Sequence, residues 1–433
     1  EALVGIAAAT WLSPFLLRGY RFRCKMTVGS RAWKRTMTKP GVTFETIDSA
    51  SSDLAAILFT SGSTGPAKGV CYEHGMFDAQ LRLLREQYRI TSGEVDLTLL
   101  PVFALFNPAL GMTTVVPEMD PARPAQADPE LIVEAIQQAG VTNSFGSPAL
   151  WTNIVRYCES AGQTLPSVRR IQIAGAPVPP SLIRRLKAIL PAGEVNTPYG
   201  ATEALPVSNM VGTEVLKTTQ TLTDEGRGTC VGRPFPEVRV RVIRTTDGPL
   251  GAISEAEVLP LGEVGEIIVN GPSVTRQYES RPEATAAAKI PDADVPGGLW
   301  HRMGDLGYLD AEGRLWFCGR KAERVLSADG EFFTDCCEAI VNVHPDVARS
   351  ALIGLGEPGT QEPAIVVEPE KGKFPVGKAA EDAFRASVRE RLAASPVTGR
   401  IERVFFKEAF PVDVRHNAKI HRLALAREFT AKK

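Results

Sequence analysis

The sequence of 433 residues lacks the features that mark several specialised classes of protein. No apolar run reaches the ~20 residues that a membrane-spanning helix requires. The seven cysteines form no CxxC pair and the five histidines no HExxH cluster, so no zinc site is indicated and buried thiols in a reducing cytoplasm are expected. With 49 basic and 50 acidic residues, the net charge of −1 gives no reason to expect nucleic acid or a membrane as the main partner.

The start of the chain lacks the features of a natural N-terminus. Glu1 stands where an initiator methionine is usual, and "EALVGIAAATW" predicts a strand and turn already inside a domain, without the pattern of a signal peptide. We therefore expect that the first part of the domain is missing. Residues 18–39 carry eight basic residues and no acidic one. This segment could bind a membrane surface or an acidic partner. We favour the alternative, a solvated face whose acidic neighbours lie in the missing segment.

Strand-like and helix-like segments alternate along most of the chain. Helical spacing is found in "YEHGMFDAQLRLLREQY", "DPELIVEAIQQAG" and "PPSLIRRLKAIL", whereas "VRRIQIAG" and "GEIIVNG" are short β-type runs. This alternation predicts an α/β fold with helix-covered sheets. Short strands between glycine and proline turns predict a β-rich subdomain at 221–319, within an N-terminal domain of residues 1–319. A break near "GRKAERV" precedes a smaller α+β domain at 325–433.

A glycine-rich loop, "LFTSGSTGPAKGV", occupies residues 58–70. Backbone N–H groups in such a turn point together at phosphate oxygens, and its hydroxyls and Lys68 add donors and charge. The pattern GxxxxGK[ST] fails here, because Gly69 stands where a magnesium-binding hydroxyl is needed after the lysine. The sequence thus predicts a phosphate site that is not a P-loop, with a merely flexible connection as the alternative.

Further motifs follow this loop in a fixed order. They are "AGAP" at 174–177, "PYGATE" at 198–203, "GEVGEI", "HRMGDLGYLDAEGRLWFCGR" at 301–320 and "RHNAKIHR" at 415–422. Together with "TSGSTGPAKG" they resemble the motifs of the adenylate-forming superfamily, which contains acyl-CoA synthetases, luciferases and nonribosomal adenylation domains. Two departures are Ala67 in place of the usual proline before Lys68, and Ala418 in place of the glycine before Lys419.

The resemblance implies a set of residues that bind ATP and Mg²⁺. Tyr199 would stack on adenine, Asp305 would accept the ribose hydroxyls with Arg320 on the other side, Thr202 would bind the α-phosphate and Glu203 would bind Mg²⁺. The full set for the nucleotide is Thr60, Ser61, Gly62, Ser63, Thr64, Gly65, Lys68, Gly175, Ala176, Pro177, Tyr199, Gly200, Asp305 and Arg320.

The resemblance also implies a mobile C-terminal domain. Lys419 matches the catalytic lysine that neutralises charge as the substrate carboxylate attacks the α-phosphate, so we assign Lys419, Glu203 and Thr202 to catalysis. The domain would turn at a hinge of residues 320–324, in which Glu323 takes the pivot position.

The segment "LPVFALFNPALGM" indicates the substrate. It is strongly apolar and has Ala104 where common acyl-CoA synthetases carry a histidine gate, so we predict an acyl pocket formed by Phe103, Ala104, Phe106, Gly146 and Ser147. Long stretches such as "FALFNPALGMTTVVPEMDPARPAQADP", "TPYGATEALPV", "ATAAAKI" and "FPVDVRHNAKI" resemble the β-lactone synthetase subfamily of bacterial long-chain olefin biosynthesis.

The resemblance to that subfamily implies a reaction. A long-chain 2-alkyl-3-hydroxy acid would be adenylated, and its own β-hydroxyl would then expel AMP and close a β-lactone. A complex with the thiolase-like and β-lactone decarboxylase enzymes of the pathway is expected as well. A fatty acyl-CoA or acyl-AMP ligase and a non-catalytic binding protein remain alternatives. The sequence identifies no base for the hydroxyl; His301, Asp310 and His416 are candidates by position alone, and Cys336–Cys337 is interpreted as a packed helix start.

Overall fold

The structure is a computed structural model that describes residues 2–5, 7, 10, 12–13, 22–38, 46–60, 67–120, 123, 126–412 and 420–431. The chain divides into two compact units, residues 1–49 and 50–433. The first unit contains the parallel strands β1 (Ala2–Gly5) and β2 (Cys24–Thr27) and the helix α2 (Arg31–Met37). Ser30 begins α2, because its side chain accepts a hydrogen bond from the backbone N–H of Trp33 at 3.2 Å. Among the described residues, no helix is both long and apolar enough to cross a membrane.

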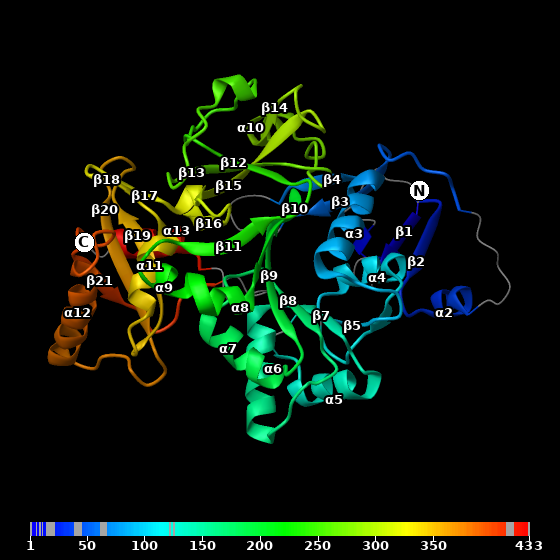
Figure 1. The fold of residues 1–433 in the computed structure, drawn as a ribbon, viewed down its shortest axis with the longest axis horizontal. Helices are drawn as coiled ribbons and strands as arrows, with labels where there is room; N and C mark the ends of the chain where they lie inside the picture. Colours follow the sequence, from blue (N-terminus) through cyan, green and yellow to red (C-terminus); the bar gives the residue numbers. More distant parts are fainter. Residues whose placement is uncertain are drawn as a thin grey trace. The chain divides into compact units, whose positions relative to one another are not determined.

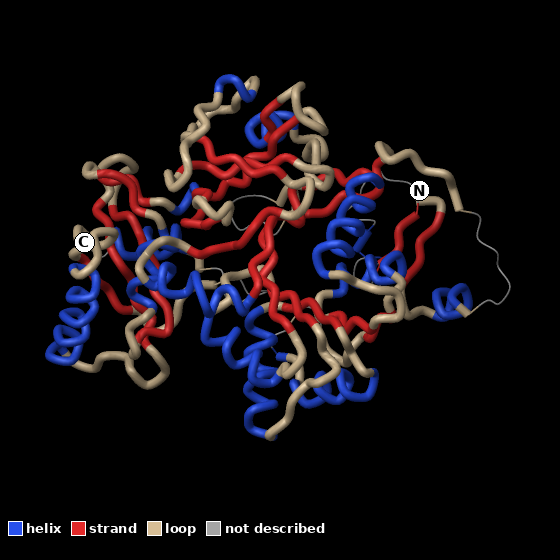
Figure 2. The backbone as a smooth tube through the Cα atoms, in the orientation of Figure 1, coloured by secondary structure: helices blue, strands red, loops and turns tan. Residues whose placement is uncertain are grey.

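One large mixed sheet forms the centre of the second unit (Figures 1 and 2). Its parallel part runs in the order β6 (Thr113–Val115), β5 (Val95–Thr98), β7 (Asn143–Gly146), β8 (Arg170–Ile173) and β9 (Glu194–Ala201). The helices α5 (Pro129–Ala139), α6 (Pro148–Ala161) and α7 (Pro180–Ile189) connect these strands. Helical spacing predicted α5 and α7, whereas α6 was not predicted. The prediction of an α/β fold is therefore confirmed.

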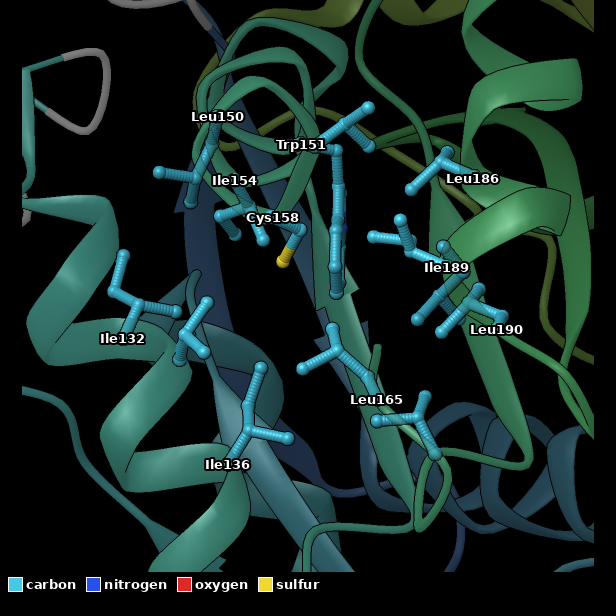
Figure 3. Close-up of a cluster of buried hydrophobic side chains, with 14 of the residues drawn as sticks. Ile132, Ile136, Leu150, Trp151, Ile154, Cys158, Leu165, Leu186, Ile189 and Leu190 are labelled. Atoms are coloured by element: carbon cyan, nitrogen blue, oxygen red, sulfur yellow. The ribbon is translucent and has the colours of Figure 1, made fainter. Parts of the chain in front are cut away.

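The helices are held by caps and by one apolar core. The Asp128 side chain caps α5 by accepting from the N–H of Glu130 at 3.0 Å, and Gly140 ends that helix with a φ of 61°. Trp151, Ile154 and Leu186 are among the buried side chains between the helices and the strands (Figure 3). Burial of this apolar surface fixes the helices against the sheet, and so sets where the strand ends lie.

The antiparallel part continues the same sheet through β10 (Ala204–Val211), which pairs with β9 on one side and with β11 (Thr229–Pro234) on the other. Beyond β11 the order is β16 (Leu315–Arg320), β15 (Leu299–Leu309), β13 (Gly265–Asn270) and β12 (Arg239–Ile243), and β14 (Lys289–Pro291) pairs with β15. Residues 221–319 are thus rich in strands, as predicted, although those strands extend the parallel sheet. Their assignment as a separate subdomain stays a prediction. The short helices α8 (Gly212–Glu214), η3 (Val215–Thr219), α9 (Gln220–Asp224), η4 (Ile253–Glu255) and α10 (Pro282–Ala288) lie between the strands in sequence.

A separate hairpin carries the glycine-rich loop. Strands β3 (Leu54–Phe59) and β4 (Gly69–Glu73) pair antiparallel, and α3 (His74–Tyr88) follows them. The sequence predicted the helix after the loop, but not β4. The segments η1 (Pro101–Phe106) and α4 (Asn107–Leu110) follow β5.

The C-terminal region contains a second, smaller sheet of β19 (Val347–Leu355), β20 (Glu362–Pro369) and β21 (Arg403–Phe406). It follows η5 (Lys321–Glu323) and the hairpin β17 (Val325–Ser327) and β18 (Gly330–Phe332), and it includes α11 (Thr334–Asn342), α12 (Lys378–Ala393) and α13 (Arg422–Thr430). Cys336 and Cys337 are buried in α11, as the interpretation of a packed helix start requires. The domain boundary at 320–324 stays a prediction.

Candidate functional site

The carboxyl ends of three neighbouring parallel strands carry predicted site residues. Gly146 ends β7 and Ser147 follows it, the turn 174–177 follows β8, and Tyr199 and Gly200 lie near the end of β9. The N–H of Ala174 donates to the carbonyl of Gly146 at 3.2 Å, which holds the first two segments side by side. Gly175 has a φ of 92°, a conformation that side chains rarely adopt. Ligands of open α/β sheets bind at such strand ends, so the topology gathers these residues at one edge.

Tyr199, Asp305 and Arg320 form a connected cluster. The Tyr199 hydroxyl donates to Asp305 Oδ2 at 2.5 Å, and the Arg320 guanidinium lies 2.9 Å from Asp305 Oδ1. Asp305 and Arg320 face each other in the β15–β16 ladder, so strand register sets their contact. Burial and the Asp305 charge raise the pKa of Tyr199 well above its ordinary value, which keeps its hydroxyl protonated as a donor. The three residues that the sequence predicted to hold adenine and ribose are thus brought together.

The β9–β10 turn presents Thr202 and Glu203, and three side chains from distant segments anchor it. The Tyr72 hydroxyl donates to the Thr202 carbonyl at 2.6 Å. The backbone N–H and hydroxyl of Thr275 donate to the Glu203 carbonyl at 2.9 and 3.0 Å, and the Tyr278 hydroxyl donates to Glu203 Oε1 at 2.7 Å. The turn is therefore fixed before any ligand binds. Sequence reasoning missed all three anchors, because a tyrosine or threonine far from a motif carries no signal of its own.

The base of the glycine-rich loop is closed by two hydrogen bonds. The N–H of Thr60 donates to the Lys68 carbonyl at 3.0 Å, and the N–H of Lys68 donates to Thr60 Oγ1 at 3.1 Å. The Lys68 ammonium lies 4.9 Å from the centre of the Tyr278 ring, a cation–π contact that links the loop to the Glu203 turn. The predicted phosphate ligands between them, Ser61, Gly62, Ser63, Thr64 and Gly65, lie outside the described residues.

Glu203 fits the role of a magnesium ligand. Its Oε1 accepts from Tyr278, and among the described residues no side chain donates to Oε2. The described part of the chain contains no group of three or more histidine, cysteine or acidic side chains that could hold a metal. Mg²⁺ is commonly held by one or two carboxylates together with substrate phosphates, and a single carboxylate beside a phosphate loop suits that arrangement.

The β14–β15 ladder contains two buried basic side chains. Lys289 and His301 face each other in the β14–β15 ladder, and both are almost fully buried. Burial lowers the pKa of Lys289 to about 7, against the opposing effect of the Glu203 charge. Burial and the Lys289 charge hold the pKa of His301 well below its ordinary value. His301, a candidate base by position, is therefore a neutral side chain whose Nδ1 lies 3.2 Å from the Ala288 carbonyl.

The segment predicted to form the acyl pocket carries neighbouring aromatic rings. The Phe103 ring lies 4.1 Å from that of Phe145, the residue before Gly146, and 6.4 Å from that of Phe106. Ala104 is half-buried in the same segment. Ser147 has a structural task as well, because its hydroxyl accepts from the N–H of Leu150 at 3.4 Å and begins α6. The sequence analysis did not name Phe145.

A buried polar network connects the end of η1 to the parallel strands. Asn107 donates to Asp96 Oδ2 at 2.9 Å, and Thr98 donates to the same oxygen at 3.0 Å. Asn143 donates to Asp96 Oδ1 at 2.5 Å and accepts from Gln172 at 3.0 Å. Because Asn107 directly follows η1, the network fixes the end of the aromatic segment to the parallel strands.

Arg422, the first residue of α13, links Glu323 of the predicted hinge to α11. The Arg422 guanidinium donates to Glu323 at 2.9 Å and to both oxygens of Glu338, at 2.7 and 2.6 Å. Asp310 accepts from the side chains of Arg314 and Trp316 at 2.6 and 2.7 Å, so it has a salt-bridge role in a turn. Lys419 and His416 lie outside the described residues, although Val412 and Ile420 on either side of that segment form a β-bridge.

Comparison with known proteins agrees with this geometry. The AMP-binding enzyme family matches residues 23–279. The chain is 49% identical over 382 residues to the olefin β-lactone synthetase of Xanthomonas campestris pv. campestris, which covers 88% of this chain and 67% of that protein. It is 46% identical over 439 residues to the olefin β-lactone synthetase of Stenotrophomonas maltophilia, which covers 98% of this chain and 77% of that protein.

Solved structures share the fold at lower identity. The amide bond synthetase McbA from Marinactinospora thermotolerans superposes with a TM-score of 0.76 at 23% identity, over 99% of this chain and 80% of that one. The O-succinylbenzoate coenzyme A synthetase of Bacillus subtilis, solved with ATP and a magnesium ion, gives 0.72 at 21% identity, over 98% and 79%. The superfamily that the motifs indicated is confirmed, and the chain belongs to the AMP-binding enzyme family.

Proposed function

We propose that the protein is an ATP-dependent β-lactone synthetase that acts on a long-chain 2-alkyl-3-hydroxy acid. The observation that carries the proposal is the identity of 49% and 46% with two olefin β-lactone synthetases over most of the chain. The intact cluster of Tyr199, Asp305 and Arg320 supports it, because a chain that had lost adenylation would have no need to keep that cluster.

The first half-reaction would be adenylation. Tyr199 offers its ring to adenine while Asp305 and Arg320 receive the ribose, and Thr202 faces the α-phosphate from the anchored turn. Glu203 would hold Mg²⁺, which would neutralise charge on the phosphates. A carboxylate oxygen of the substrate attacks the α-phosphorus, the bond to the β-phosphate oxygen breaks, and pyrophosphate leaves. Lys419 stabilises the charge that develops in this step.

The second half-reaction would be lactone closure. The β-hydroxyl oxygen attacks the acyl carbon, the bond to the phosphate oxygen breaks, AMP leaves, and the hydroxyl proton is released. The nucleophile belongs to the same molecule, and well-oriented intramolecular reactions reach effective molarities of ~10⁵–10⁸ M. The aromatic wall of Phe103, Phe106 and Phe145 would hold the alkyl chains in the conformation that places hydroxyl and carboxylate together.

The test is a product analysis of the full-length protein with ATP and Mg²⁺. A synthetic 2-alkyl-3-hydroxy acid and a plain fatty acid of the same length are compared, with and without coenzyme A, and the products are identified by NMR. We expect a β-lactone and AMP from the hydroxy acid whether or not coenzyme A is present. A coenzyme A thioester as the main product would contradict the proposal and favour the acyl-CoA ligase.

A matched pair of lysine variants separates catalysis from mere nucleotide binding. Lys419→Ala should lower adenylate formation by at least about a hundredfold, because a preorganised charge contributes strongly to the transition state. Lys217→Ala, on an exposed part of η3, should leave the rate unchanged. An unchanged rate in Lys419→Ala would instead favour the non-catalytic binding protein. Co-purification with the thiolase-like and decarboxylase enzymes tests the proposed complex.

A further inference from the structure

Lys289 is a buried cation without a close counter-ion. Its side chain is 6% exposed, and it begins β14 directly opposite His301. Its ammonium donates to the Thr275 hydroxyl at 3.3 Å, and no carboxylate of the described residues lies within 4.0 Å of it. A buried ammonium is costly unless it is paired, so a lysine kept in this state calls for an explanation beyond packing.

The acidic residue linked to Lys289 is Glu203. Thr275 connects the two residues, because its hydroxyl accepts from Lys289 and donates to the Glu203 carbonyl. Glu203 is also the acidic group whose charge acts on Lys289. The ammonium of Lys68 lies over the Tyr278 ring, whose hydroxyl donates to Glu203 Oε1. Two lysines are therefore linked to Glu203, each through one intervening side chain.

This arrangement disfavours a free divalent cation. A metal ion that approached Glu203 alone would gain one carboxylate and would be repelled by the ammonium of Lys289 at low local dielectric. A metal ion that arrives on a triphosphate brings several negative charges with it, which reverse the sign of its interaction with both lysines. The same two lysines thus oppose the bare ion and favour its complex.

We propose that Lys289 is a positioning residue that makes metal binding at Glu203 depend on the triphosphate. It excludes free Mg²⁺ from the empty site and admits the metal as its complex with the nucleotide. The inference rests on the proposed metal and ATP site, but not on the identity of the acyl substrate or of the product.

The test measures binding of Mn²⁺, as a probe for Mg²⁺, by electron paramagnetic resonance of the free ion in the absence of nucleotide. It is made at pH 6, below the pKa of about 7 that burial gives Lys289, so that the side chain carries its charge. The wild-type protein should bind Mn²⁺ weakly, with a dissociation constant of about 1 mM or higher, as expected for a single carboxylate. Lys289→Met should bind one Mn²⁺ at least about tenfold more tightly, because the repulsion is removed. Lys217→Met, which removes an exposed charge, should behave as the wild type.

A double variant locates the new affinity. Lys289→Met combined with Glu203→Gln should return to wild-type binding, because the gained ion sits on the Glu203 carboxylate. Unchanged Mn²⁺ affinity in folded Lys289→Met, or a gain that persists in the double variant, would overturn the proposal. Calorimetric titration with a non-hydrolysable ATP analogue at saturating Mg²⁺ provides a second readout, in which Lys289→Met should bind several-fold more weakly.

Two further measurements keep the test decisive if Lys289→Met fails to fold. Lys289→Arg keeps the charge and should retain the weak binding of the wild type, whereas a Mn²⁺ affinity raised tenfold in that variant would contradict the proposal. Tight Mn²⁺ binding by the wild type without nucleotide, with a dissociation constant of about 10 µM or lower, would contradict it without any variant. None of these measurements requires turnover, so a failure to form lactone leaves their outcome unaffected.

Discussion

Arg302 and Lys289 are two buried cations on neighbouring strands, and their surroundings differ. The Arg302 guanidinium donates to both oxygens of Glu266 at 3.1 and 2.6 Å, and to the carbonyls of Gly248 and Thr246 at 2.7 and 2.6 Å. Lys289 is as deeply buried but donates to one hydroxyl at 3.3 Å. The two side chains belong to strands that pair with each other, β15 and β14.

The difference separates a structural charge from one held for a ligand. Arg302 has its partners within the fold, so its burial is offset by charge-assisted hydrogen bonds. Lys289 donates a hydrogen bond only to one hydroxyl among the described residues. In our proposal the negative charge that balances it is that of the bound triphosphate. Substitution of each should therefore change the free energy of unfolding in opposite directions.

The largest effect is expected for Arg302→Met. The change leaves the Glu266 carboxylate buried without its main partner, and breaking a buried pair in this way costs about 3–5 kcal/mol. Urea unfolding followed by circular dichroism measures it. Arg239→Met, on an exposed position of β12, is the control and should change stability by less than about 0.5 kcal/mol. If Arg302→Met lowers the free energy of unfolding by less than about 1 kcal/mol, the proposed difference between Arg302 and Lys289 is contradicted.

The second effect has the opposite sign. Lys289→Met should stabilise the apo protein by about 2–4 kcal/mol at pH 7, because burial that lowers the pKa of Lys289 from 10.5 to about 7 disfavours folding. Between these two values the unfolded chain binds a proton that the folded protein does not, so wild-type stability rises with pH across this window. The gap between wild type and variant should thus be largest below about pH 7 and close toward pH 10.5. A stability difference between wild type and Lys289→Met that does not change with pH would contradict the lowered pKa of Lys289 as its cause.

The smallest effect is expected for Lys321→Met. Lys321 shares Glu266 with Arg302, at 3.2 Å, and also donates to the Thr246 carbonyl. Because Arg302 remains paired, we expect a loss of about 0.5–1 kcal/mol in urea unfolding. The double variant Arg302→Met/Lys321→Met then shows whether Lys321 compensates for the missing guanidinium. A loss in the single variant as large as that of Arg302→Met would place the structural charge on the lysine instead.

The sequence predicted the fold class and the composition of the nucleotide site because both depend on local patterns. Helical spacing identified α3, α5 and α7, and the motifs around Tyr199 and Asp305 lie in strands whose register the hydrophobic alternation determines. β4 was missed, because the short segment after the loop resembles the approach to a helix.

Residues that act through tertiary contacts could not be predicted. Tyr72 and Tyr278 are 130 and 75 positions away from the residues that they hold. The sequence around Lys289 indicates no special role, and its surroundings are known only once β14 pairs with β15. Such pairings depend on non-local burial, which a single sequence does not display. The network from Asp96 to Gln172 is of the same kind, since its members come from three strands and the segment after η1.

The bridge between Val412 and Ile420 has a mechanical consequence. Ile420, the residue after Lys419, is buried in the apolar core of the C-terminal region together with Phe410 and Leu425. Lys419, which we propose as the catalytic lysine, is thus joined by one peptide bond to a residue anchored in that core. If Lys419 serves adenylation as proposed and the C-terminal region then rotates, the lysine would leave the phosphates only when the whole region turns.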